Sequence, residues 1–182
     1  MKTRIIICLL TTSLVSIVVP FADAQQAKKI PRIGYISVSA LSTRVEAFQR
    51  GLRELGYVEG KNIVIEYRSA EGKLDRLPVL AAELVALKVD VIVSPGATTT
   101  RAIKQATATI PIVMTQDPDP VGNGFVASLG HPGGNITGLS SMTADLSGKR
   151  LELLKEILPK LSRVAVFETS TNMGNARQLR ET

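Results

Sequence analysis

The segment Val89–Arg101, VDVIVSPGATTTR, constrains the fold more than any other part of this 182-residue chain. Its first half is a run of mainly β-branched residues, which Ser94-Pro95-Gly96 interrupts before a stretch with helical character from Ala97 to Ala106. A continuous apolar run bounded by turn residues is typical of a strand buried on both faces of a parallel sheet. We therefore expect a strand, a turn rich in hydroxyl groups, and a helix with Thr98 as its N-cap.

This strand–turn–helix unit also suggests where function lies. In open α/β sheets, ligands bind at the carboxyl ends of the strands, because free backbone N–H groups and small polar side chains converge there. The alternative is that the hydroxyl groups of Thr98, Thr99 and Thr100 only cap the helix. The sequence of this segment alone leaves both interpretations open.

The rest of the chain repeats the alternation of strand and helix. We expect further strands at Pro31–Ser39, Ile63–Arg68, Ile110–Met114, Asn135–Leu139 and Arg163–Phe167. Further helices are expected from Thr43 to a C′ residue at Gly56, over Asp75–Leu87 and over Asp145–Leu158, with a short one at Phe125–Leu129. Such alternation predicts an α/β fold with a doubly wound parallel sheet and helices on both faces.

The N-terminal 24 residues have the pattern of a secretory signal peptide. Lys2 and Arg4 form a charged start, Ile5–Val19 is apolar, and Ala22-Asp23-Ala24 matches an A-x-A cleavage site. We expect a mature chain that begins near Gln25, with residues 25–30 as a linker, and a periplasmic location. An uncleaved membrane anchor is the alternative, although the apolar run is short for a membrane span.

Composition excludes several classes of function. The single cysteine, Cys8, lies inside the signal segment, so the mature chain has no disulfide, Cys–zinc site or cysteine nucleophile. Basic residues are scattered and tryptophan is absent, which argues against a nucleic-acid partner. The only histidine, His131, lies in a His-Pro-Gly-Gly turn and is expected at the surface. We expect no metal, no cofactor and no enzymatic activity.

Three blocks of the sequence resemble a known family. They are FQRGLRELGYVEGKNIVIEYR at Phe48–Arg68, LPVLAAELVALKVDVIVSPGATTTRAIKQATATIPIVM at Leu77–Met114 and DPVGNGFVASLGHPGGNITGLS at Asp119–Ser140. Together they resemble the substrate-binding proteins of bacterial ABC transporters, in the group described as tryptophan/tyrosine-type. The resemblance extends over nearly all of the mature chain.

The resemblance implies a fold of the periplasmic-binding-protein type I kind. Such proteins have two α/β lobes joined by crossing strands, and hinge closure traps the ligand between the lobes. Residues 31–140 would form the N-terminal lobe, and residues 141–182 would begin a second lobe that stays incomplete. We therefore expect the chain to be either a fragment or the product of a truncated gene.

Small polar residues follow three of the expected strands, and parallel strands bring their carboxyl ends to one crevice. Hydroxyl and N–H groups of the first and third loops suit a carboxylate, and Asp117 suits an ammonium group, as an amino acid would require. The alternatives are that the serines only cap turns and that Asp117 only starts the Asp-Pro-Asp-Pro turn. The candidate ligand-binding residues are Ser37, Ser39, Ser94, Gly96, Ala97, Thr98, Thr115 and Asp117.

The leading interpretation is a periplasmic solute-binding component of an ABC importer. It would capture a small organic solute, with an amino acid as one candidate, and deliver it to a permease in the inner membrane. A periplasmic solute-sensing module for a signalling receptor is the alternative, because the same lobe would serve both. An α/β enzyme is disfavoured because no acid–base constellation is visible, and a repressor would need a DNA-binding segment where the signal peptide stands.

Overall fold

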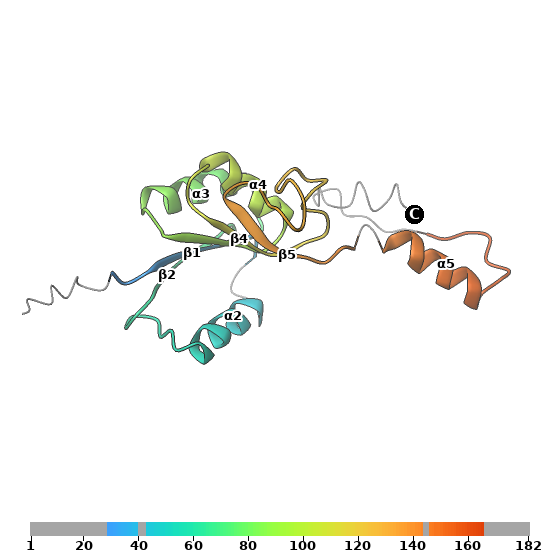
Figure 1. The fold of residues 1–182 in the computed structure, drawn as a ribbon, viewed down its shortest axis with the longest axis horizontal. Helices are drawn as coiled ribbons and strands as arrows, with labels where there is room; N and C mark the ends of the chain where they lie inside the picture. The colour runs from blue at the N-terminus through green and yellow to red at the C-terminus, as the bar shows by residue number, and fades with distance from the viewer. Residues whose placement is uncertain (1–28, 40–42, 144–145, 166–182) are drawn as a thin grey trace, which may run out of the picture.

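Five parallel strands form one sheet in the computed structural model, which describes residues 29–39, 43–143 and 146–165. The order across the sheet is β2-β1-β3-β4-β5, so the chain starts near one edge and then crosses to the other (Figure 1). The strands are β1 (Arg32–Ser37), β2 (Val64–Ser69), β3 (Val91–Ser94), β4 (Ile112–Asp117) and β5 (Ile136–Ser140). The parallel order 2-1-3-4-5 confirms the predicted doubly wound α/β class.

Helices lie on both faces of the sheet, as predicted. Figure 1 shows α2 on one face and α3 with α4 on the other, while α5 lies apart from the sheet. The helices are α2 (Thr43–Glu54), the short 3-10 helix η1 (Leu74–Arg76), α3 (Leu77–Ala86), α4 (Ala97–Ala106) and α5 (Ser147–Ile157). Among the described residues, no helix combines the length and the apolar character needed to cross a membrane.

The two faces of the sheet carry separate apolar cores. On the α2 face, Ile33 and Tyr35 of β1 are buried against Val45 of α2. On the opposite face, Ile36 belongs to a larger core that includes Leu84 of α3. Successive strand side chains point to opposite faces, which is why β1 contributes to both cores. Full burial of one such side chain stabilises the fold by about 1.5 to 3 kcal/mol.

Turn chemistry ends α2 as the sequence predicts. The N–H of Gly56 donates to the carbonyl of Arg53 over 2.9 Å, and the N–H of Tyr57 donates to the carbonyl of Leu52 over 2.9 Å. These two bonds are the pair that defines a Schellman motif with Gly56 at C′. The chain then turns into β2, the edge strand.

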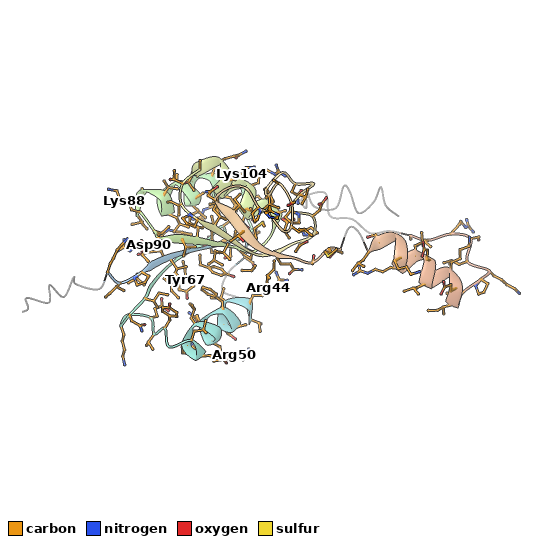
Figure 2. The ribbon with its side chains drawn as sticks, viewed as in Figure 1. Arg44, Arg50, Tyr67, Lys88, Asp90 and Lys104 are labelled. Carbon is orange, nitrogen blue, oxygen red and sulfur yellow. The ribbon has the colours of Figure 1, made fainter. Side chains whose placement is uncertain are left out.

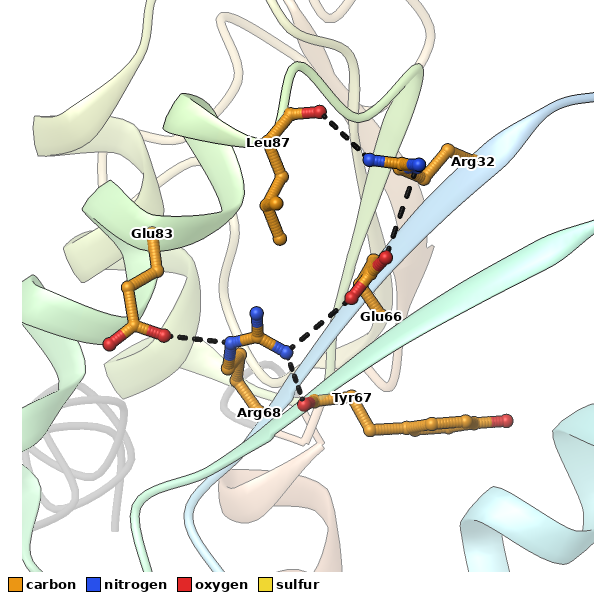
Figure 3. A network of polar contacts seen from close by, with 6 residues as sticks. All are labelled: Arg32, Glu66, Tyr67, Arg68, Glu83 and Leu87. Atoms are coloured by element: carbon orange, nitrogen blue, oxygen red, sulfur yellow. Dashed lines mark hydrogen bonds and ion pairs between the residues drawn. The ribbon is translucent and has the colours of Figure 1, made fainter.

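A row of ion pairs ties the edge strand β2 to its neighbours (Figure 3). Glu66 lies between two arginines, 3.8 Å from Arg32 Nε and 3.7 Å from Arg68 Nη1. Arg68 Nε also donates to Glu83 of α3 over 2.8 Å, and Arg32 Nη1 donates to the carbonyl of Leu87 over 3.4 Å. Each partly exposed pair contributes at most about 1 kcal/mol. Charges on an edge strand also discourage pairing with another chain.

Two expected elements are wrong. Residues 125–129 form an irregular loop rather than a short helix, because the N–H groups of Phe125 and Val126 donate back to the carbonyl of Pro120 and that of Ala127 donates to the carbonyl of Pro132. The expected strand Arg163–Phe167 is not formed in its described part, residues 163–165, which follow α5 away from the sheet. Residues 166 and 167 lie outside the described residues, as do residues 1–28 with the expected signal peptide.

Candidate functional site

The candidate site is an open cavity at the carboxyl edge of the sheet. Because the strands are parallel, the loops after β1, β3, β4 and β5 all leave this edge. The chain order reverses between β1 and β3, and such a switch point separates two neighbouring loops and leaves room for a ligand. The cavity has a volume of 370 Å³, within the range of small-molecule sites. Its walls are Val38, Arg44, Pro95, Gly96, Ala97, Thr98, Thr99, Thr115, Gln116, Pro118, Ser141 and Thr143.

Four of the eight candidate ligand-binding residues lie in this wall and four do not. Gly96, Ala97 and Thr98 contribute from the start of α4, and Thr115 contributes from β4. The other four, which do not line the cavity, are Ser37, Ser39, Ser94 and Asp117. The structure therefore brings the third loop and β4 to one cavity, while the two serines after β1 stay outside it.

Ser37 ends β1 and Ser39 follows it, and one local hydrogen bond links the two residues. Ser37 Oγ donates to the carbonyl of Ser39 over 2.6 Å, which is the local turn bond that the alternative interpretation anticipated. Among the described residues of this loop, Val38, between the two serines, lines the cavity.

The loop between β3 and α4 owes its shape to Gly96. Gly96 stands at the N-cap of α4 with φ of +108°, a conformation that L-residues with a side chain rarely adopt. The prediction of Thr98 as N-cap is therefore wrong, since the helix already begins at Ala97. Its first turn leaves backbone N–H groups without helical partners, and these groups lie at the cavity.

Buried hydroxyl groups brace this loop from behind. Ser94 is fully buried, and its Oγ lies 2.8 Å from Thr99 Oγ1 and 2.8 Å from Thr100 Oγ1. Both threonine hydroxyls also donate to the carbonyl of Gly96 over 2.9 Å. Ser94 and Thr100 therefore brace the loop between β3 and α4, and neither of them lines the cavity.

Asp117 is sealed behind the cavity rather than exposed to it. Its side chain is fully buried, and Oδ1 accepts from the N–H of Asp119 over 2.8 Å and from Asn123 Nδ2 over 3.0 Å. Burial raises the pKa of the Asp117 carboxyl above its ordinary value, and the charge of Arg101 acts in the opposite direction. Among the described residues, Asp117 Oδ2 and Arg101 Nε have no hydrogen-bond partner. Arg101 lies over the ring of Phe125, 5.3 Å from its centroid.

Sequence reasoning missed part of the wall. Arg44 comes from the first turn of α2, Gln116 and Pro118 come from the end of β4, and Ser141 and Thr143 follow β5. The signal for them was available, since a helix that follows a parallel strand begins at the carboxyl edge and the loop after the fifth strand leaves the same edge. Arg44 is the only charged residue in the described wall.

Features of metal or acid–base sites are not assembled within the described part of the chain. No group of three or more His, Cys, Asp and Glu residues there is placed to hold a metal ion. His131 is exposed, and its N–H donates to Ser128 Oγ over 3.0 Å in a local turn. The arrangement at the sheet edge, a cavity with hydroxyls, amides and one cation, is suited to binding a polar solute.

A second cavity lies between α2 and β2, away from the start of α4. Its volume is 360 Å³, and its walls include Leu52, Tyr57, Val58 and Ile63. These residues lie near the end of α2 and the start of β2, so this cavity sits at the opposite edge of the sheet from the candidate site.

Several known proteins are similar to this chain in sequence and in fold. A tyrosine-binding protein of Clostridioides difficile (strain R20291) is 31% identical over 157 residues, which cover 86% of this chain and 45% of that protein. A crystal structure of a conserved domain protein from Vibrio cholerae is 35% identical with a TM-score of 0.63, over 72% of this chain and 45% of that one.

Another similar structure contains a ligand. It is the ABC domain in complex with L-Trp from Streptococcus pneumoniae, which is 25% identical with a TM-score of 0.71 and covers 83% of this chain and 51% of that one. This chain thus spans about half the length of the relatives it matches.

The model of one family matches residues 29–182, which is nearly all of the chain beyond the expected signal peptide. That family is described as the ABC transporter substrate-binding proteins. The chain belongs to the ABC transporter substrate-binding protein family.

Proposed function

We propose that this chain is the solute-binding component of an ABC importer and that its solute is an amino acid. The observation that carries the proposal is the 370 Å³ cavity at the start of α4. A tyrosine-binding relative and a relative in complex with L-Trp support the choice of solute.

The chemistry of the cavity wall fits the carboxylate of an amino acid. Free N–H groups of the first helical turn, at Ala97 and Thr98, donate to an anion, and the helix dipole adds to the attraction. The hydroxyls of Thr98 and Thr115 offer further donors. The cavity is open on one side, as half of a site between two lobes would be.

The importer role implies a location and a partner. Residues 1–24 would direct export and be removed, and the protein would act in the periplasm. Loaded with solute, it would dock on a permease in the inner membrane. These assignments rest on family membership and on the N-terminal sequence pattern.

Thermal melting of the purified chain against a panel of L-amino acids tests this function. A ligand that binds only the folded state stabilises it by about 1.4 kcal/mol at ten times its Kd, which raises the Tm of a chain of this size by about 3 to 6 °C. We expect such a rise with L-tryptophan or L-tyrosine and none with sugars.

A matched pair of variants tests whether the rise in Tm comes from binding in this cavity. Thr98→Val removes a hydroxyl from the cavity wall and should reduce the rise, whereas Thr109→Val removes an exposed hydroxyl beyond α4 and should leave it intact. Absence of a Tm rise with every amino acid would contradict the proposal.

A further inference from the structure

Arg44 gives the described wall of the cavity its only ionised side chain. It stands in the first turn of α2, on the opposite face of the sheet from α4. The cavity therefore spans the sheet edge, with the cation of Arg44 on one side and the first turn of α4 on the other. Figure 2 shows Arg44 at the start of α2 next to the sheet, whereas Arg50 lies on the outer side of the helix.

The guanidinium of Arg44 is near the sheet but forms no ion pair with any of the described residues. Burial raises the pKa of Tyr35 in β1, and the nearby charge of Arg44 acts in the opposite direction. Six ion pairs join described residues, and none of them includes Arg44. Its charge is thus available to a molecule in the cavity.

No described residue of the wall carries a negative charge. The nearest candidate from the sequence, Asp117, is fully buried, and its Oδ1 is engaged by Asp119 and Asn123. The α4 dipole places partial positive charge at the same cavity. The electrostatics of this wall therefore favour anions and give an ammonium group no partner.

We propose that Arg44 is a specificity-determining residue that makes a carboxylate necessary for binding to this lobe and an ammonium group dispensable. The solutes that fit are organic monocarboxylates, with amino acids as one subset. This inference rests on the proposed function only for the location of the site. An arginine–carboxylate contact adds strength and direction to the donors of α4.

Three indole compounds separate the two charges of an amino acid, and calorimetric titration of the chain with each tests the inference. L-Tryptophan carries both charges, indole-3-propionate carries only the carboxylate, and tryptamine carries only the ammonium group. We expect the first two to bind and tryptamine not to bind. Arg44→Gln should weaken the two carboxylates roughly tenfold or more, and Arg44→Lys should retain part of the affinity.

Arg50→Gln is the matched control, because Arg50 lies on the same helix and is exposed outside the cavity. It should leave all three titrations unchanged. Unchanged affinity of Arg44→Gln for L-tryptophan, or binding of tryptamine, would overturn the inference while the importer proposal stands.

The same titrations also reveal the case in which the amino-acid proposal fails and the carboxylate inference holds. If no amino acid binds but indole-3-propionate binds and Arg44→Gln weakens it, the amino-acid proposal fails and the carboxylate inference is supported. If neither L-tryptophan nor indole-3-propionate binds, the carboxylate inference is overturned as well.

Discussion

At the scale of single residues, Asp117 has the least solvent-exposed ionisable side chain among the described residues. It is fully buried at the end of β4, and only Oδ1 has hydrogen-bond donors within the described structure. Burial disfavours the ionised form, so the pKa of the carboxyl is raised in the folded state. A raised pKa of an acid makes folding most favourable when the group is protonated.

The upward shift of the Asp117 pKa determines how the stability of the fold depends on pH. The stabilising contribution of Asp117 is fully present below the ordinary pKa of 3.8 and is lost as pH rises through the raised folded-state value. Asp117→Asn keeps an oxygen acceptor for Asp119 and Asn123 but cannot ionise. The variant should therefore gain free energy of unfolding relative to the parent between pH 4 and 7.

Urea unfolding of both proteins across this pH range measures the difference. A difference in unfolding free energy that stays constant with pH would show that Asp117 does not titrate as its burial requires.

The sequence indicated where the backbone of the cavity wall runs, but not the direction of every side chain, and ligand binding by these residues stays a prediction. Gly96, Ala97 and Thr98 lie in the cavity wall because their place after a buried strand fixes where their backbone runs. Ser94 and Asp117 are fully buried. The hydrogen-bond partners of both side chains lie within six residues of them along the chain, but the pattern of residue types does not show that the following segment folds back over each side chain.

At the scale of elements, β5 depends on a glycine at its centre. Gly138 pairs with Met114 of β4 and has φ of +143°. An added Cβ would lie 2.1 Å from the carbonyl oxygen of Met114, which is closer than real Cβ atoms come to any atom. Pairing of β5 with β4 therefore requires glycine at this position.

Gly138→Ala should lower the free energy of unfolding by more than about 2 kcal/mol, through steric overlap and backbone strain. Gly134→Ala is the matched control, because an added Cβ there meets no atom within 4 Å. The control should change stability by less than about 0.5 kcal/mol. Denaturant unfolding compares the two, and equal effects would contradict the role assigned to Gly138.

The sequence predicted most elements because their patterns are local. The helix Ala97–Ala106 has the predicted bounds, since a turn tripeptide precedes it. The short helix at Phe125–Leu129 did not form, because the segment takes its hydrogen bonds from Pro120 and Pro132 on either side. A strand in residues 163–165 did not form either, because a strand requires a paired neighbour as well as β-branched residues.

At the scale of the whole molecule, the proposed binding site has one of its walls in this chain. It spans about half the length of its relatives, and its cavity opens at the carboxyl edge of one five-stranded sheet. The doubly wound topology by itself predicts that ligands bind at this edge of the sheet. The contribution of Arg44 to the cavity wall was not predicted, because it depends on how the first turn of α2 lies over the sheet.

Amide chemical shifts of the ¹⁵N-labelled chain during titration with L-tryptophan would show whether solute binds at the start of α4. We expect the largest shifts at Gly96, Ala97 and Thr98, with smaller ones at Arg44. Largest shifts in the second cavity between α2 and β2, at Leu52, Tyr57 and Ile63, or no shifts at all, would contradict this expectation.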